Sequence, residues 1–419
     1  MSLIKAGLMP MLNKIVSVTL AVILFILIFC RSISFSQVSE LTPGIFMKSG
    51  SCNTYLIKTV EGYVLIDPGS EGSPASDWLK PIKDSVRAVL LTHGHPDHIQ
   101  FINEWHENHT PIYVNQEFIE FQHYNTRLFG FYSVRNSIQG ASEPIELKNP
   151  GNYKATIIPD HFFHESDTIV VGNMHFIMIH VGGETPDQSL IWLPEKKAVF
   201  IGDNYFISFP NLYTLRGTRP RWALDYIHAL DLALEAKPEA LYPGHEKPVL
   251  GKKTIEEKVS KYRNAIQYVH DQTVKGMNEG KDVFTLMQEI SLPDSLKMPE
   301  FFGRVSWSVR GIYEGYAGWF NGNISNMYTL SNESIYPELL QLAGGSDAML
   351  KLAENFISQK AYVKALFVTD IILQTHKDDK KALETRLSIA KALRSLSRNG
   401  IENMWLDHEI ERLKLAMNG

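Results

Sequence analysis

The apolar residues of this chain follow three patterns in succession. A continuous apolar run fills residues 15–30, behind a basic start. Short apolar runs of strand length then alternate with turn residues and with stretches of helical spacing. Beyond about residue 265 the strand patterns stop, and apolar residues recur at the i, i+3, i+4 and i+7 positions that indicate helices. The succession predicts a leader at 1–36, an α/β domain at 37–265 and an all-α region at 266–419.

The run at residues 15–30 has the form of a secretory signal peptide. Its 16 residues are few for a membrane span, and small residues near its end allow cleavage after Ser36. We therefore expect a periplasmic or secreted protein, with an uncleaved N-terminal membrane anchor as the alternative. Only Cys52 remains once the leader is removed, so the mature fold has no intrachain disulfide.

The composition is that of soluble globular domains. The chain of 419 residues is long enough for two domains and a sizeable core. Its residues are 44% hydrophobic and 21% charged, as in ordinary globular proteins. The formal net charge of -5 gives no reason to expect nucleic-acid binding. We therefore expect no nucleic-acid partner.

Four side chains of the kinds that bind metals stand within six residues, at His93, His95, Asp97 and His98. They follow the β-branched and leucine-rich run 86–91, which is typical of a strand buried on both faces, and they precede a helical pattern. The motif therefore lies in a strand-to-helix turn. Imidazole nitrogens and carboxylate oxygens are the donors that zinc accepts. The two alternating histidines can share one metal, while the aspartate and the last histidine reach a second.

This HxHxDH pattern resembles the signature of the metallo-β-lactamase superfamily. The resemblance implies an αββα sandwich with two Zn²⁺ ions per chain and further ligands at the ends of later strands. Glu184, in "GGETPDQ", stands where most members carry a histidine, and a carboxylate oxygen binds zinc at about the same 2.0 to 2.2 Å. On this resemblance one metal has His93, His95 and Glu184, the other has Asp97, His98 and His245, and Asp203 bridges both.

The segment "NLYTLRG", residues 211–217, narrows the resemblance to the alkylsulfatases of this superfamily. Arg216 offers a planar fork of donors that suits sulfate, and Asn211 and Tyr213 can add hydrogen bonds. The alternative is an arginine at a domain interface. The chain departs from the family in having Asp203 where a glutamate is usual, and it lacks two histidines upstream of this segment. The group that protonates the leaving group therefore stays open.

Two weaker signals surround the motif. Asp67 ends a predicted strand, where it is either an acceptor for a ligand histidine or a turn-forming residue. Tyr124, Asn125, Arg127 and Arg135 lie in an aromatic-rich helical stretch, where they either face an anion or serve the structure alone.

The all-α region also resembles the alkylsulfatases. Residues 300–323 are similar to the family's helical segment, and the later residues form two helical hairpins of tetratricopeptide-like spacing. In the family this region is a helical dimerisation domain, so the resemblance implies a homodimer. Typical members continue into a sterol-carrier-like domain, which this sequence does not show. The handling of long alkyl chains is therefore an open question.

We therefore predict a metal-dependent hydrolase that converts an alkyl sulfate and water to an alcohol and sulfate. A water between the two metals is the expected nucleophile, with Asp97, Asp203 and Arg216 as catalytic residues. One alternative is another hydrolase on the same fold, acting on an ester, lactone, lactam or phosphoester. A second alternative is a binding protein whose helical repeats recruit a partner while the metal is structural.

Overall fold

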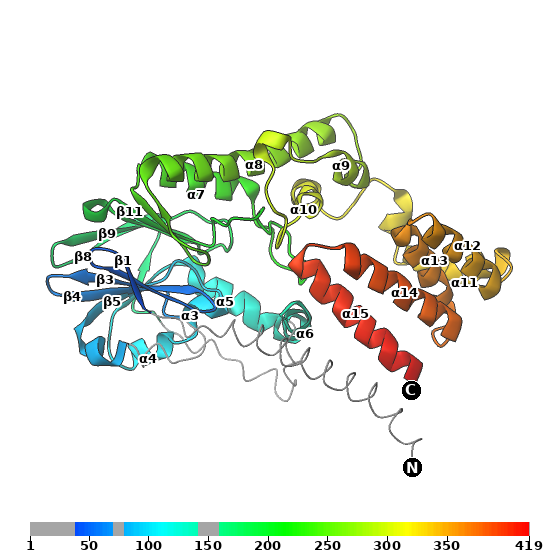
Figure 1. Cartoon of the computed structure of the whole chain (residues 1–419), viewed down its shortest axis with the longest axis horizontal. Helices are drawn as coiled ribbons and strands as arrows, with labels where there is room; N and C mark the ends of the chain where they lie inside the picture. Colours follow the sequence, from blue (N-terminus) through cyan, green and yellow to red (C-terminus); the bar gives the residue numbers. More distant parts are fainter. Residues whose placement is uncertain (1–37, 70–78, 141–158, 419) are drawn as a thin grey trace, which may run out of the picture.

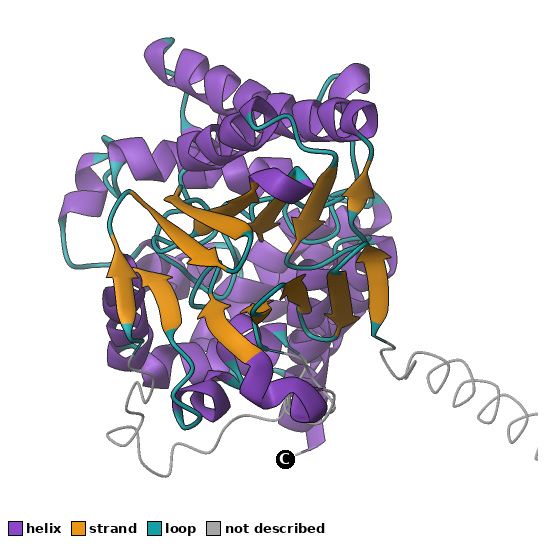
Figure 2. Cartoon of the chain, turned by 90° about the vertical axis from the view of Figure 1, so that its left-hand side faces the viewer, coloured by secondary structure: helices purple, strands orange, loops and turns teal. Residues whose placement is uncertain are grey.

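The computed structural model describes residues 38–69, 79–140 and 159–418, so the expected leader lies outside the described residues. Two β-sheets lie face to face in the first half of the chain, and helices cover both outer faces (Figure 1, Figure 2). This arrangement confirms the predicted αββα sandwich and the helical region behind it. No helix among the described residues is long and apolar enough to cross a membrane.

The first sheet contains its seven strands in chain order. Strands β1 to β4 pair antiparallel, whereas β4 to β7 run parallel. Parallel strands need crossover connections, and these carry the helices of the outer face. The strands are β1 (Ser39–Thr42), β2 (Ile45–Ser49), β3 (Asn53–Thr59), β4 (Gly62–Ile66), β5 (Val86–Leu90), β6 (Ile112–Asn115) and β7 (His161–Phe163). The helices of the crossovers are α3 (Pro96–Ile99), α4 (Ile102–His106), α5 (Glu117–Arg127) and α6 (Phe129–Gln139).

The second sheet has the order β13-β12-β11-β10-β9-β8. It is antiparallel except for the parallel pair β11 and β12. Helices α7 and α8 lie over its outer face (Figure 1). The elements are β8 (Ser166–Val171), β9 (Met174–His180), β10 (Ser189–Leu193), β11 (Ala198–Gly202), β12 (Ala240–Pro243), β13 (Val249–Leu250), α7 (Ala223–Glu235) and α8 (Lys252–Asn278).

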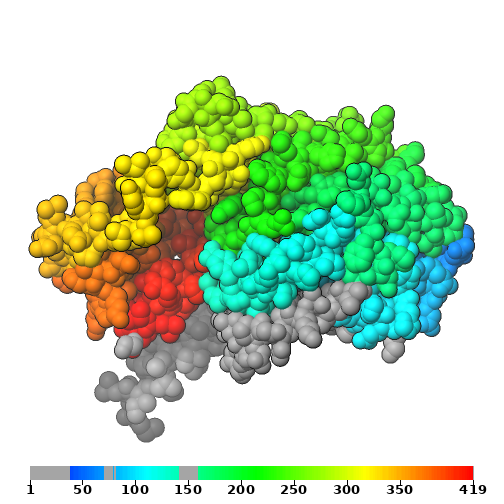
Figure 3. All heavy atoms as spheres, turned by 180° about the vertical axis from the view of Figure 1, so that it is seen from behind, coloured from blue at the N-terminus to red at the C-terminus, as the bar shows by residue number. Residues whose placement is uncertain are grey.

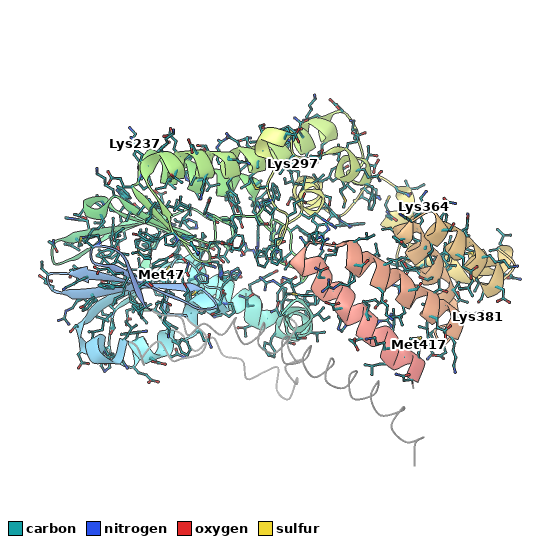
Figure 4. All side chains as sticks on the ribbon, in the orientation of Figure 1. Met47, Lys237, Lys297, Lys364, Lys381 and Met417 are labelled. Atoms are coloured by element: carbon teal, nitrogen blue, oxygen red, sulfur yellow. The ribbon has the colours of Figure 1, made fainter. Side chains whose placement is uncertain are left out.

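Apolar side chains fill the space between the two sheets. Ile57 of the first sheet and Phe176 of the second are fully buried in this layer. Lysines such as Lys237 and Lys364 are exposed and point outward (Figure 4). At one edge the loops of the two sheets meet, because the Ser189 N–H donates to the Thr92 carbonyl oxygen at 2.7 Å. The strand ends that precede the predicted metal ligands lie at this edge.

The transition to the helical region has no break at the predicted boundary. Residue 265 lies inside the continuous helix α8, and the next two helices pack with it into the core behind the second sheet. These are α9 (Val283–Glu289) and α10 (Val305–Ala317). The division of the chain into two domains near residue 265 stays a prediction.

The remaining helices form a second core. Ala353, Ala365 and Ile372 are buried there, and consecutive helices pack in pairs as their spacing predicts. The last helix then returns to lie beside α6 (Figure 1). This second group consists of α11 (Tyr336–Leu342), α12 (Ser346–Ser358), α13 (Tyr362–Thr375), α14 (Lys380–Leu396) and α15 (Gly400–Asn418).

Candidate metal centre

The HxHxDH turn follows β5, and its backbone is held from both sides. Pro96 begins the short helix α3, so Asp97 and His98 lie in its first turn. Gln122 of α5 donates to the Gly94 carbonyl oxygen at 2.8 Å. A Cβ at position 94 would lie 2.5 Å from the Gln122 amide nitrogen, so a larger residue there would displace Gln122 from its hydrogen bond. The local sequence thus places three imidazoles and one carboxylate on the same edge of the sheet.

The structure brings all seven predicted ligands together at this edge. Asp203 follows β11 directly, His245 follows β12 after Gly244, and Glu184 lies in the loop after β9. The Asp203 carboxylate is 3.4 Å from His98 Nε2, 3.2 Å from His245 Nε2 and 3.7 Å from His93 Nε2. Three groups have donor atoms that all lie within 4.8 Å of one another: His93, His98 and Asp203; Asp97, His98 and His245; and His95, Glu184 and Asp203.

Asp67 orients His98. Its carboxylate accepts from His98 Nδ1 at 2.9 Å, from the Thr92 N–H at 2.8 Å and from the Thr92 hydroxyl at 2.6 Å. The other imidazole nitrogen, His98 Nε2, is therefore turned into the centre, where it is buried with no hydrogen-bond partner. Asp203 Oδ1 is a second such atom. Buried nitrogen and oxygen atoms that lack hydrogen bonds are available to coordinate a cation. A hydrogen bond from the second imidazole nitrogen to a carboxylate is the usual way in which a metal-binding histidine is oriented.

The charge states also suit a metal. Burial lowers the pKa of His93 to about 4, and it lowers the pKa of His95 well below its usual range. Both rings are therefore neutral at neutral pH, as metal ligands must be. Burial acts to raise the pKa of Asp203, but the neighbouring His245 and His98 hold it well below its usual range, so this carboxylate is ionised.

Glu184 has two partners that the sequence did not reveal. Its carboxylate forms an ion pair with the buried guanidinium of Arg221 and accepts a hydrogen bond from the hydroxyl of Tyr226. Its Oε1 also lies 3.8 Å from His95 Nδ1. A glutamate in place of a neutral histidine makes the centre more anionic, and the adjacent Arg221 offsets that charge. No pattern around these two residues distinguishes them in the sequence.

A cavity of about 560 Å³ opens onto the centre. Three predicted ligands line it together with Arg216, Arg221 and Asn211, whose Oδ1 is buried without a hydrogen-bond partner. The opposite wall is apolar. It combines residues of the sandwich with residues of the helical region, namely Phe206, Phe209, Phe302, Ile401 and Met404.

Tyr213 is not among the residues that line this cavity. Gly311 of α10 lies against it, because a Cβ at Gly311 would be 2.8 Å from Tyr213 Cβ. The geometry therefore gives no support to the predicted contact between Tyr213 and a substrate, since the irregular segment turns this side chain toward α10.

Of the four polar residues predicted in the aromatic-rich helices, two line a cavity and two do not. Tyr124 and Asn125 line a second cavity of about 290 Å³, which His95 and Arg216 also border. Arg127 is largely exposed and pairs with Glu120. Arg135 faces no cavity described here, and it donates instead to backbone carbonyls of the Arg216 segment.

An αββα sandwich with this donor cluster at one edge defines a metal-dependent hydrolase of the metallo-β-lactamase type. Comparison with known families agrees. Residues 48–245 match the metallo-beta-lactamase superfamily model, and residues 284–412 match the alkyl sulfatase dimerisation model. The chain therefore combines a metallo-beta-lactamase domain with an alkyl sulfatase dimerisation region behind it.

Individual relatives are similar along most or part of the chain. A linear primary-alkylsulfatase from a Pseudomonas species is 27% identical over 378 residues, which are 84% of this chain and 71% of that protein. The alkyl/aryl-sulfatase BDS1 of Saccharomyces cerevisiae is 28% identical over 234 residues, 54% of this chain and 35% of that protein. The solved structure of the sec-alkylsulfatase Pisa1 from Pseudomonas sp. has a TM-score of 0.80 and 21% identity, covering 90% of this chain and 66% of that one. This last likeness supports the fold.

Proposed function

We propose that the chain is a di-zinc alkylsulfatase that cleaves alkyl sulfate esters to alcohol and sulfate. One observation carries the proposal: a single cavity has metal-type donors, two guanidinium groups and an apolar wall. These three features match the three parts of an alkyl sulfate, namely the scissile ester, the sulfate anion and the hydrocarbon chain. The names of the relatives support the same substrate class.

The proposed ligand sets are those that the family resemblance implies. His93, His95 and Glu184 hold one zinc ion, Asp97, His98 and His245 hold the other, and Asp203 bridges them. In support, the Asp203 carboxylate lies within 3.7 Å of histidine nitrogens from both sets. Two zinc ions so placed supply a Lewis acid and a water of lowered pKa.

The side chains of the cavity bind and orient the substrate. Arg216 and Arg221 bind the sulfate oxygens, because guanidinium groups donate charge-assisted hydrogen bonds to tetrahedral anions. Asn211 adds a neutral polar contact. Asp97, whose Oδ2 is 3.4 Å from His245 Nε2, is placed to accept the proton of the attacking water. The apolar wall excludes water from the hydrocarbon chain.

Sulfate release from dodecyl sulfate by zinc-loaded protein tests this function. Arg216→Ala should lose most of this activity while its zinc content stays at two ions per chain. Arg127→Ala is the matched control, because Arg127 is exposed and pairs with Glu120 away from the cavity. Turnover of a lactone, lactam or thioester without any sulfate release would instead show another hydrolase of this fold. Less than one zinc per chain would favour the binding-protein alternative.

We also propose that two copies associate through the segment between α10 and α12. Large apolar side chains are widely exposed there: Trp319 76%, Ile324 70%, Tyr328 73%, Leu330 74% and Leu342 86%. In Figure 3 this segment is the yellow band between the catalytic domain and the helices at the left. Contiguous apolar exposure of this kind marks an interface. Light scattering should give the mass of a dimer, and Leu330→Asp combined with Leu342→Asp should give a monomer; an unchanged mass contradicts this surface.

We further propose that the leader directs the chain to the periplasm or the exterior, with cleavage after Ser36. Strand β1 begins at Ser39, so this cleavage leaves the whole sandwich in the mature protein. N-terminal sequencing of the protein purified from its host should begin at Gln37. A sequence that begins within the first few residues would show an uncleaved anchor.

A further inference from the structure

The segment that carries Arg216 has no regular secondary structure of its own, and helix α6 holds it in place. Gln139 Oε1 accepts from the Thr214 hydroxyl at 3.0 Å and from the Arg216 N–H at 3.1 Å. Asn136 Oδ1 accepts from the Arg216 guanidinium at 3.2 Å. The anion-binding side chain is therefore positioned by a helix that belongs to a crossover of the other sheet.

Arg135 supplies the remaining contacts from the same helix. Its Nε donates to the Arg216 carbonyl oxygen and its Nη2 donates to the Leu215 carbonyl oxygen, both at 2.6 Å. One planar guanidinium thus holds two consecutive peptide groups. A lysine keeps the charge but has no fork, so it cannot reproduce this paired geometry.

The last helix of the chain holds Arg135 from the other side. The Arg135 guanidinium carbon lies 5.3 Å from the ring centre of Trp405, on α15, and 4.9 Å from that of Phe131. Contact with an aromatic face stabilises a guanidinium and limits its rotation. Helix α15 packs against α6, and the same helix places Ile401 and Met404 in the cavity wall.

The start of α15 is itself fixed to the apolar wall. The Asn399 side-chain amide donates to the carbonyl oxygens of Glu300, Phe302 and Gly303, at 2.7, 3.3 and 3.2 Å. The Gly400 N–H donates to the Phe301 carbonyl oxygen at 2.7 Å. Helix α15 therefore contacts both the apolar wall of the cavity and, through Trp405, the arginine that holds the Arg216 segment.

We propose that Arg135 is a positioning residue for Arg216, and that α15 holds it in place through Trp405. The helical region then determines sulfate binding within its own chain, in addition to any role in dimerisation. This inference rests on the proposed function, because it assigns the anion contact to Arg216. It predicts a defect in binding of the sulfate group, with the metal centre and the apolar wall intact.

Two variants test the two contacts separately. Arg135→Lys keeps the charge and loses the fork, and Trp405→Leu keeps an apolar contact and loses the aromatic face. We expect Arg135→Lys to raise KM for dodecyl sulfate about tenfold, the effect of losing one charge-assisted hydrogen bond. Trp405→Leu should raise KM severalfold. Inhibition by inorganic sulfate should weaken in parallel, while zinc content, unfolding temperature and kcat stay close to those of the unmodified protein.

The double variant and a surface control complete the experiment. Because both residues act on Arg216 through one contact, the double variant should resemble Arg135→Lys alone rather than show the product of the two effects. Arg127→Lys, on the preceding helix, should change nothing. Unchanged KM and unchanged sulfate inhibition in Arg135→Lys overturn the inference. A KM increase in the double variant that equals the product of the two single increases overturns it as well. If Arg135→Lys fails to fold, Trp405→Leu decides alone: an unchanged KM overturns the inference. Absence of all sulfate-ester cleavage by the unmodified protein refutes the proposed function instead.

Discussion

Replacement of Asp67 by asparagine tests how the metal centre is oriented. Asparagine has nearly the same size and tolerates the positive φ of 52° at this position, so the backbone can stay as it is. The carboxylate accepts three hydrogen bonds, one from His98 and two from Thr92. An amide offers one acceptor oxygen and one donor nitrogen. In either orientation of the amide, a donor therefore faces a donor.

The effect of Asp67→Asn on His98 determines how much metal affinity is lost. Without an acceptor at Nδ1, the imidazole loses the preference for the tautomer whose Nε2 is free to bind a metal. That nitrogen lies 3.4 Å from Asp203 and 3.8 Å from Asp97, and it makes no hydrogen bond. Loss of such a supporting contact weakens metal affinity about 10- to 100-fold, which corresponds to about 1.4 to 2.7 kcal/mol.

Titration of the metal-free protein with zinc, in competition with a chromophoric chelator, measures this change. We expect Asp67→Asn to weaken the binding of one zinc ion by that factor and to affect the other less. Asp160→Asn is the matched control, because Asp160 also accepts from a backbone N–H, that of Ile112 at 3.0 Å, but at the start of β6. Equal affinities in Asp67→Asn and the unmodified protein would refute the orienting role of Asp67.

Three further predictions follow from the same structure. Removal of metal by a chelator should lower the unfolding temperature, since His98 Nε2 and Asp203 Oδ1 are left buried without hydrogen bonds; calorimetry should show recovery when zinc is restored. Met404→Trp should fill part of the cavity and reduce kcat/KM for dodecyl sulfate more than for hexyl sulfate; an equal reduction contradicts the wall assignment. Burial raises the pKa of Asp187 to about 7. Because the folded state then binds the proton more tightly, stability falls as pH rises from about 4 to about 7, and urea midpoints of Asp187→Asn should lack this fall.

The metal centre was predictable only to the extent that its residues are close in sequence. His93, His95, Asp97 and His98 lie in one turn, where the strand before it and the helix after it are visible in the local pattern. The remaining ligands, such as Glu184, were placed by resemblance to a family, because single residues after separate strands carry no local signal. The structure brings both kinds to the same edge.

The residues that sequence reasoning missed share a physical cause. Arg221 and Tyr226 reach Glu184 because α7 packs over the sheet, which brings its first turn and the residues just before it against the loop after β9. Nothing in the order of residues encodes that approach. Tyr213 illustrates the reverse case, since it shares an irregular segment with Arg216 but lies against α10. Without a helical or strand period, spacing does not indicate which way a side chain points.

The sequence alone therefore determined the order of strands and helices, the donor cluster after β5 and the helical character of the second half. Periodicity shows which face of an element is buried, but it does not show which other element covers that face. Only the tertiary structure placed the predicted boundary at 265 inside α8, and only it brought Arg135 between Trp405 and the Arg216 segment. Such contacts join residues 80 and more positions apart, and they arise from packing of completed elements rather than from any local pattern.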